Sequence, residues 1–142
     1  MEKKLLVVLD TNVFVSGLIS PHGAPGAILR RFRQKDFEII TSSVQIKEVQ
    51  DVLARPSLRK ALPSGTTREI LKFFLEFKKL TRVVALCPQL PWSFQDPKDH
   101  FLLDLIVYAN ADFLVTGDKK LRALLLVGDT AIVTPTEFIA QI

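Results

Sequence analysis

The stretch KKLLVVLDTN, residues 3–12, decides the fold. Its five consecutive apolar residues, Leu5 to Leu9, have the pattern of a β-strand that is buried on both faces. Such strands belong to parallel sheets that are covered by helices on both sides. We therefore expect a strand over Lys3–Asp10, with small polar groups exposed where the apolar run stops at Asp10.

Strand and helix patterns alternate along the rest of the chain, which is typical of βαβ units. We expect one domain over residues 1–142, a three-layer α/β/α fold with a five-stranded parallel sheet. The further strands expected are Phe37–Thr41, Arg82–Leu86, Phe113–Thr116 and Ala131–Thr134. The helices expected are Ala24–Arg33, Val44–Ala54, one from Thr66 or Thr67, one from Asp96–Asp99 to about Asn110, Lys119–Leu125 and one from Pro135.

Composition limits the compartment and the partners of the chain. The single cysteine, Cys87, excludes an internal disulfide and a thiolate-rich zinc site, so a reducing cytoplasm is the expected location. No apolar run approaches the roughly 20 residues that span a bilayer, so we expect no membrane partner. The net charge of +4 favours a polyanion such as RNA, because phosphate neutralisation releases counterions.

Four acidic residues that are far apart in the sequence are expected at one edge of the sheet. In a parallel α/β sheet, strand ends and the starts of crossover helices lie at the same edge, where open sheets bind ligands. Asp10 ends the first strand and Asp118 follows the fourth. Glu48 lies early in the helix after the second strand, and Asp99 starts the helix before the fourth. Each alone has an ordinary alternative as a helix cap, turn or surface residue, so their joint placement carries the hypothesis.

The predicted acidic cluster indicates metal-dependent chemistry. Carboxylates gathered closely repel one another, and a hard divalent cation removes that repulsion. Oxygen ligands without clustered His or Cys suit Mg²⁺ or Mn²⁺ better than zinc. Such ions stabilise charge on a phosphate, so the reaction indicated is hydrolysis of a phosphodiester bond.

The ordered set of motifs resembles the PIN-domain nucleases over essentially the whole chain. The matching segments are LDTN (residues 9–12), Glu48, Asp99, LVTGD (residues 114–118) and VTPTEF (residues 133–138). The resemblance implies a Rossmann-like five-stranded parallel sheet and Mg²⁺- or Mn²⁺-dependent cleavage of RNA. It also implies roles for six residues: Asp10, Glu48, Asp99 and Asp118 as metal ligands, and Asn12 and Thr116 as groups that orient carboxylates or contact water.

Many small PIN-domain proteins are VapC-like toxins, which are commonly dimeric and are held inactive by a cognate antitoxin. The resemblance therefore implies a type II toxin, an antitoxin partner and a homodimer. Two features depart from the most compact toxins, the loop 20–26 and the proline-rich stretch 86–94. The third acid has two candidates, Asp96 and Asp99, and the spacing of Asp99 to Asp118 fits the family better.

Two rival functions remain open at this point. The first is a catalytically silent PIN-like module that binds RNA or regulates a partner. The second is a phosphate-handling α/β enzyme in which Asp10 accepts a phosphoryl group beside Lys119 or Lys120. In that enzyme, however, Glu48 and Asp99 would have no evident role.

Several other residues have simpler interpretations. Lys119, Lys120 and Arg122 could contact an RNA backbone beside Asp118. The remaining groups are expected to be structural: solvated basic faces at Arg30, Arg31, Arg33 and Lys35 and at Arg55, Arg59 and Lys60, core anchors at Trp92 and Phe94, a buried apolar Cys87, and surface histidines at His22 and His100.

Overall fold

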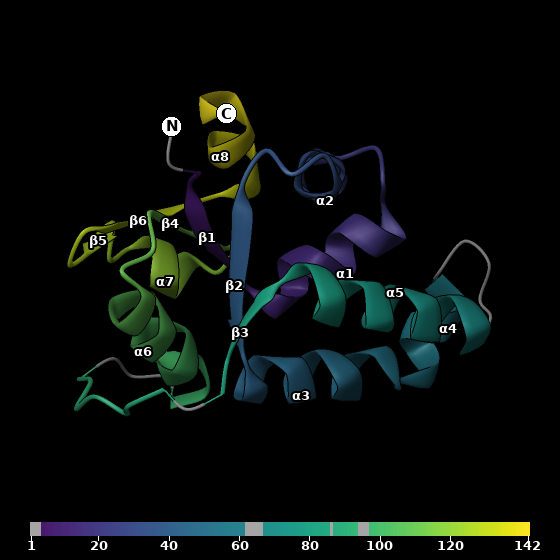
Figure 1. The fold of residues 1–142 in the computed structure, drawn as a ribbon, viewed down its shortest axis with the longest axis horizontal. Helices are drawn as coiled ribbons and strands as arrows, with labels where there is room; N and C mark the ends of the chain where they lie inside the picture. The colour runs from purple at the N-terminus through teal and green to yellow at the C-terminus, as the bar shows by residue number, and fades with distance from the viewer. Residues whose placement is uncertain (1–3, 62–66, 86, 94–96) are drawn as a thin grey trace.

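The computed structural model describes residues 4–61, 67–85, 87–93 and 97–142. Neighbouring strands in its sheet pair in parallel, except for β5 with β6, and the order across the sheet is β3-β2-β1-β4-β6-β5. The expected α/β fold is confirmed, with β1 and β4 as its central strands (Figure 1). The strands in the described residues are β1 (Leu6–Leu9), β2 (Glu38–Ser42), β3 (Arg82–Val84), β4 (Phe113–Val115), β5 (Leu126–Val127) and β6 (Thr130–Val133).

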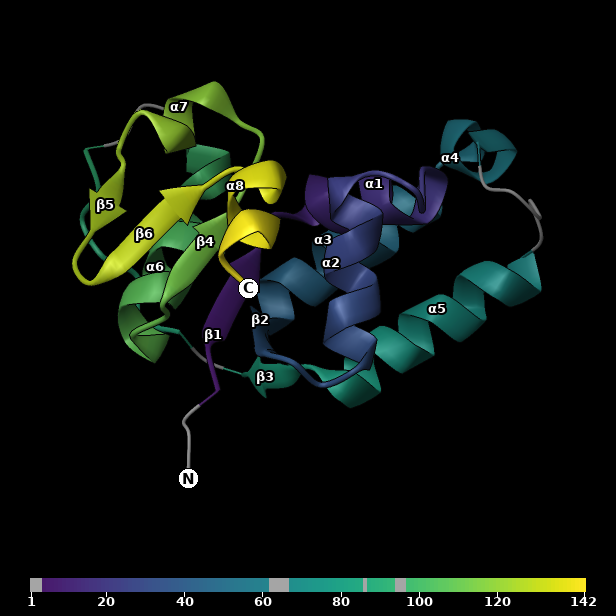
Figure 2. The same ribbon diagram turned by 90° about the horizontal axis from the view of Figure 1, so that it is seen from above.

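Helices cover both faces of the sheet, as Figures 1 and 2 show. One face packs against α1 (Thr11–Ile19), α2 (Ala24–Arg33), α3 (Ser43–Leu53), α5 (Thr67–Leu80) and α8 (Pro135–Gln141). The other face packs against α6 (His100–Ala109) and α7 (Lys119–Arg122). The short α4 (Pro56–Ala61) follows α3, and a 3-10 turn (Pro97–Asp99) leads into α6. This is the expected three-layer arrangement.

The apolar run that predicted β1 fills both halves of the core. Val7 and Leu9 are fully buried on the face of α1 and α2, and Leu6 and Val8 are buried on the face of α6. Side chains alternate between the two faces of a strand, so only a continuous apolar run satisfies both cores. The polar residue Asp10 therefore follows at the point where the strand leaves both cores.

The sheet has six strands in the described residues, so the expectation of five was one too few. The additional strand, β5, is only two residues long and pairs antiparallel with β6 through the two-residue turn Gly128–Asp129. Gly128 has a φ of +57°, which glycine adopts without strain. The helix expected over Lys119–Leu125 ends at Arg122, which frees Leu126 to enter this hairpin.

Two helices were absent from the expected set. In α1, apolar residues lie all around the helix rather than along one stripe, so the residues after Asp10 give a weak helical period. In α4, Pro56 is the first residue of a helix rather than only the stop of the preceding one, a position where proline is well tolerated.

Helix α5 is less buried than its apolar sequence suggested. Phe77 is buried against Phe14, with ring centroids 4.5 Å apart. Leu71 and Leu75, however, are 54% and 57% exposed. Among the described residues, no helix has the length and apolar character needed to cross a membrane.

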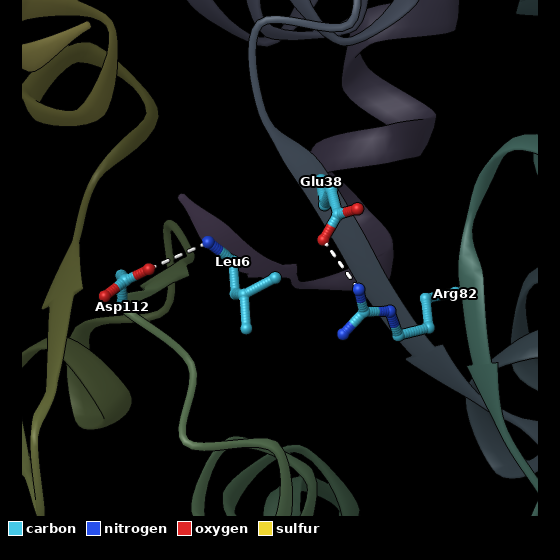
Figure 3. Close-up of polar contacts among 4 residues, drawn as sticks. All are labelled: Leu6, Glu38, Arg82 and Asp112. Carbon is cyan, nitrogen blue, oxygen red and sulfur yellow. Dashed lines mark hydrogen bonds and ion pairs between the residues drawn. The ribbon is translucent and has the colours of Figure 1, made fainter. Parts of the chain in front are cut away.

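Polar contacts tie together the starts of the strands, at the edge opposite Asp10 (Figure 3). Asp112 precedes β4, and its Oδ2 accepts a hydrogen bond of 2.8 Å from the backbone N–H of Leu6. The Asp112 N–H in turn donates to the Leu6 carbonyl at 2.8 Å. Arg82 and Glu38 form an exposed ion pair of 2.9 Å between β3 and β2. Asp112 therefore has a structural role that sets the start of the β1–β4 pairing.

We expect Asp112→Ala to lower the free energy of unfolding by about 1–2 kcal/mol, because the Leu6 N–H loses a charged acceptor. Urea denaturation measures this change. Glu38→Ala is the matched control: it breaks only the exposed ion pair and should cost less than about 1 kcal/mol. An Asp112→Ala variant as stable as the unmodified chain would contradict this role.

Candidate active site

Asp10 leaves the sheet at the carboxyl end of β1 and is largely buried, with 9% of its surface exposed. Its Oδ2 accepts a hydrogen bond of 2.7 Å from the hydroxyl of Thr116, and its Oδ1 accepts a long contact of 3.4 Å from the Asn12 N–H. The residue is also the N-cap of α1. The end of β1 thus presents an oriented carboxylate, but the expected exposure of the polar groups was wrong for Asp10 and Thr11, which are buried, and holds only for Asn12.

Asp118 reaches the same place from the neighbouring strand. In the parallel pairing of β1 with β4, Leu9 lies opposite Val115, so the residues that follow both strands emerge side by side. The backbone N–H of Asp118 donates to the Thr116 hydroxyl at 3.0 Å. One hydroxyl therefore joins Asp10 to the start of the Asp118 segment.

The charge of Asp10 depends on its burial and on its neighbours. Burial raises the pKa of Asp10 above its ordinary value of 3.8, and the negative charge of Asp118 raises it further, while the hydrogen bond from Thr116 lowers it. Asp118 is half-buried and caps α7, because its Oδ1 accepts from the N–H groups of Lys120 at 2.7 Å and Leu121 at 3.3 Å. A cation at this pair would relieve an unfavourable concentration of negative charge.

Glu48 is held at the same edge by a threonine. It lies on α3, and its Oε2 accepts a hydrogen bond of 2.8 Å from the hydroxyl of Thr11, the residue directly after Asp10. Sequence reasoning assigned Thr11 no role of its own. Its place between Asp10 and the first turn of α1 is the signal that could have suggested one.

Gln45 is a second residue whose role the sequence did not suggest. Its side chain is fully buried one turn before Glu48. The amide nitrogen donates to the Leu9 carbonyl, and the amide oxygen accepts from the Thr41 hydroxyl at 2.6 Å. This amide fixes the first turn of α3 against β1 and β2, and so fixes the helix that carries Glu48.

Asp99 lies at the junction of the 3-10 turn with α6, where it is the N-cap of the helix. Helices α3 and α6 contact each other. Glu48 on α3 lines a cavity together with Pro97, the first residue of the 3-10 turn, and His100, the first residue of α6. Asp99 lies between these two residues in the sequence. The alternative third acid, Asp96, lies outside the described residues.

The structure joins some of the six predicted site residues by hydrogen bonds and not others. Asp10, Thr116 and Asp118 are joined by hydrogen bonds, and Glu48 is joined to the residue after Asp10. Asn12 contributes its backbone N–H, while its side chain is exposed. In residues 4–61, 67–85, 87–93 and 97–142, no three Asp, Glu, His or Cys side chains form a group close enough to hold a metal ion.

The surroundings agree with most of the simpler interpretations. Trp92 anchors its loop by donating from Nε1 to the buried Asp104, and Arg31 and Arg33 form ion pairs with Asp36 and Glu76. His100 was expected at the surface, but it is half-buried and lines the cavity beside Glu48, because α6 packs its first turn against α3.

Comparison with known proteins identifies the family. The model of the PIN domain matches residues 6–120, a span that contains all six predicted site residues. An uncharacterized protein from Methanocaldococcus jannaschii is 35% identical over 125 residues, which cover 87% of this chain and 78% of that protein.

A solved structure shares the fold of this chain. A chain in the crystal structure of VapBC2 from Rickettsia felis, bound to a DNA fragment from their promoter, superposes with a TM-score of 0.59. It covers 92% of this chain and 98% of its own length at 16% identity, a likeness that establishes the fold alone. The chain belongs to the PIN domain family.

Proposed function

We propose that this PIN-domain protein is a metal-dependent endoribonuclease that hydrolyses phosphodiester bonds in RNA. The observation that supports it most directly is the junction at the carboxyl ends of β1 and β4, where Asp10 and Asp118 meet at the Thr116 hydroxyl. Central neighbouring strands of an open α/β sheet are the usual place for a ligand site.

The residues at this edge fit Mg²⁺ or Mn²⁺ by the chemistry of their donors. All are carboxylate oxygens, and an ionised carboxylate has about four lone-pair sites, so the hydrogen bonds on Asp10 and Asp118 leave lone pairs for a cation. Asp10 and Asp118 would anchor the ion, and Glu48 and Asp99 would complete its coordination. When bound, the metal would stabilise charge on the phosphate and activate water for attack.

The chain's own residues hold this site in place. Thr116 donates to Asp10 and so fixes the orientation of the carboxylate, while Thr11 does the same for Glu48. Gln45 fixes the first turn of α3 through the Leu9 carbonyl. A side chain that is already oriented loses less conformational freedom when it binds a cation. Hydrogen bonds from neighbouring residues to metal ligands commonly have this orienting function.

The basic residues of α7 favour RNA as the substrate. Lys119 and Lys120 follow Asp118 directly and are exposed, and Arg122, the last residue of α7, is half-buried. A nucleic acid whose phosphate lies at Asp118 would pass these cations, which supply affinity independent of sequence.

The proposal includes a biological role. We propose that the chain is the cytoplasmic toxin of a type II toxin–antitoxin pair, one domain over residues 1–142 that pairs as a homodimer and is inhibited by an antitoxin. The likeness to a chain in the VapBC2 structure favours an antitoxin partner. A short open reading frame directly upstream that encodes a DNA-binding protein would support this role.

A catalytically silent PIN module is the second candidate. The observation that favours it is that the described residues hold no preformed group of three metal ligands. Calorimetry with Mn²⁺ separates the two candidates: binding that depends on Asp10 supports the enzyme, and the absence of binding supports the silent module.

Asp10→Asn should abolish most activity, on the order of 100-fold or more, because it removes the charge of the central ligand while its volume and fold are kept. Cleavage of single-stranded RNA with Mn²⁺ is the assay. Asp129→Asn, at an exposed position in the β5–β6 turn, is the matched control and should be fully active. An active Asp10→Asn enzyme would refute the mechanism.

Thr116→Val should lower activity or Mn²⁺ affinity by about 10- to 100-fold, because Asp10 loses the hydroxyl that orients it. Thr116→Ser keeps that hydroxyl and should restore most of the activity. Equal losses in the two variants would show that packing at this buried position, rather than the hydrogen bond, is responsible.

The raised pKa of Asp10 also predicts how stability depends on pH. The native state binds this proton more tightly than the unfolded chain, so the charged carboxylate lowers stability as the pH rises from about 3.8 through the native pKa. Without divalent metal at neutral pH, Asp10→Asn should therefore have the higher free energy of unfolding, and the difference should vanish in acid. Adding Mn²⁺ should stabilise the unmodified chain but not the variant. Urea denaturation at several pH values would disprove this if the variant were the less stable protein at neutral pH.

A further inference from the structure

An open cavity of about 540 Å³ adjoins the proposed metal site. Its walls come from four parts of the chain, α3, the segment after β3, the 3-10 turn and α6. The lining residues are Val44, Glu48, Gln89, Leu90, Pro97, His100, Phe101 and Asp104. Its volume is in the range of small-molecule sites.

We infer that this cavity binds a base of the RNA substrate, from a nucleotide that adjoins the cleaved phosphate. The inference rests on the proposed function and adds a determinant of base specificity to it. Continuity with the metal site is the first argument. Glu48 both lines the cavity and bonds to Thr11 beside Asp10, so a nucleotide whose phosphate lies at Asp10 has its base within reach of this space.

The apolar wall is the second argument. Val44 is 59% exposed and Leu90 is 39% exposed, although both stand at an edge that is otherwise rich in polar groups. Phe101 is half-buried on the first turn of α6 and supplies an aromatic ring to the same wall. A flat aromatic ligand gains from contact with such a surface, because single-stranded RNA bases are commonly recognised by stacking on aromatic side chains.

The charges in the cavity are the third argument. Glu48 and Asp104 repel a phosphate but accept hydrogen bonds from amino groups, while the amide of the exposed Gln89 and the imidazole of His100 can both donate and accept. A neutral base therefore fits the cavity better than a phosphate does. Adenine, cytosine and guanine carry exocyclic amino groups, so these bases should be preferred over uracil.

Asp104 also holds the wall of the cavity in position. It is 6% exposed, and its Oδ1 accepts a hydrogen bond of 2.9 Å from the Leu90 N–H and another from the indole of Trp92. These bonds fix the loop that carries Gln89 and Leu90 against α6. Trp92 does not line the cavity, but it is the only tryptophan in the sequence and its indole bonds to Asp104 in the cavity wall, so its fluorescence should respond to a change at that wall.

Binding of the four ribonucleoside 5′-monophosphates, measured by Trp92 fluorescence and calorimetry without divalent metal, tests the inference without any cleavage. We expect saturable binding of the amino-bearing nucleotides, with uridine monophosphate weaker. Phe101→Leu and Gln89→Leu should each weaken binding by about tenfold. Gln89 is exposed, so its variant should fold normally. Tyr108→Leu, an exposed aromatic position two turns further along α6, is the matched control and should bind as the unmodified chain does.

The outcomes separate this inference from the proposed nuclease. Unchanged nucleotide binding in both Phe101→Leu and Gln89→Leu, or no binding in the unmodified chain, would overturn the base site even if RNA were still cleaved. Nucleotide binding that depends on these residues, without any Mn²⁺-dependent cleavage, would support the base site and refute the nuclease. If both hold, sequencing the cleaved ends of a random RNA pool should show a base preference beside the cut that the two variants lose and Tyr108→Leu keeps.

Discussion

The candidate site depends on one hydroxyl group between two neighbouring strands. Thr116 donates to the Asp10 carboxylate and accepts from the Asp118 N–H, so it fixes both acids relative to β1 and β4. This contact requires the register in which Leu9 lies opposite Val115. A slip of one residue would turn each side chain of the strand to the opposite face, and the two apolar cores prevent it. The packing of β1 therefore determines where the acids meet.

Topology also explains why acids of similar appearance have different roles. Asp10 and Asp118 follow strand ends and Asp99 precedes α6, so topology assigns them to the carboxyl edge of the sheet. Glu48 lies midway along α3, and the hydrogen bond from Thr11 brings it to the residue after Asp10. Asp112 precedes β4 and therefore lies at the opposite edge, where its carboxylate pairs with a backbone N–H. Position along a βαβ unit thus separates candidate ligands from structural acids before any contact is known.

The sequence predicted the main fold and the placement of Asp10 and Asp118 at the carboxyl edge of the sheet, because both follow from local patterns. The apolar run of β1 and the LVTGD segment, residues 114–118, identified Asp10 and Asp118 from their own neighbourhoods. The contact from Thr11 to Glu48 spans 37 positions, and Gln45 reaches Leu9 across 36, so neither leaves a local signal. The two-residue β5 was missed for a related reason. A strand of two residues is too short to show the alternation of apolar and polar residues that marks a strand. Its apolar residues also continued the pattern of the preceding helix.

The two central acids differ in what folding requires of them. Asp118 gives one oxygen to two N–H groups at the start of α7, so the chain uses this carboxylate whether or not a cation is present. Asp10 caps α1 only through a long contact of 3.4 Å, is more deeply buried, and has the charge of Asp118 as a neighbour. An uncharged residue would serve the fold at least as well at that position. The charge of this buried acid is disfavoured by its surroundings, which is the physical reason for the proposal that a cation binds at the ends of the two central strands.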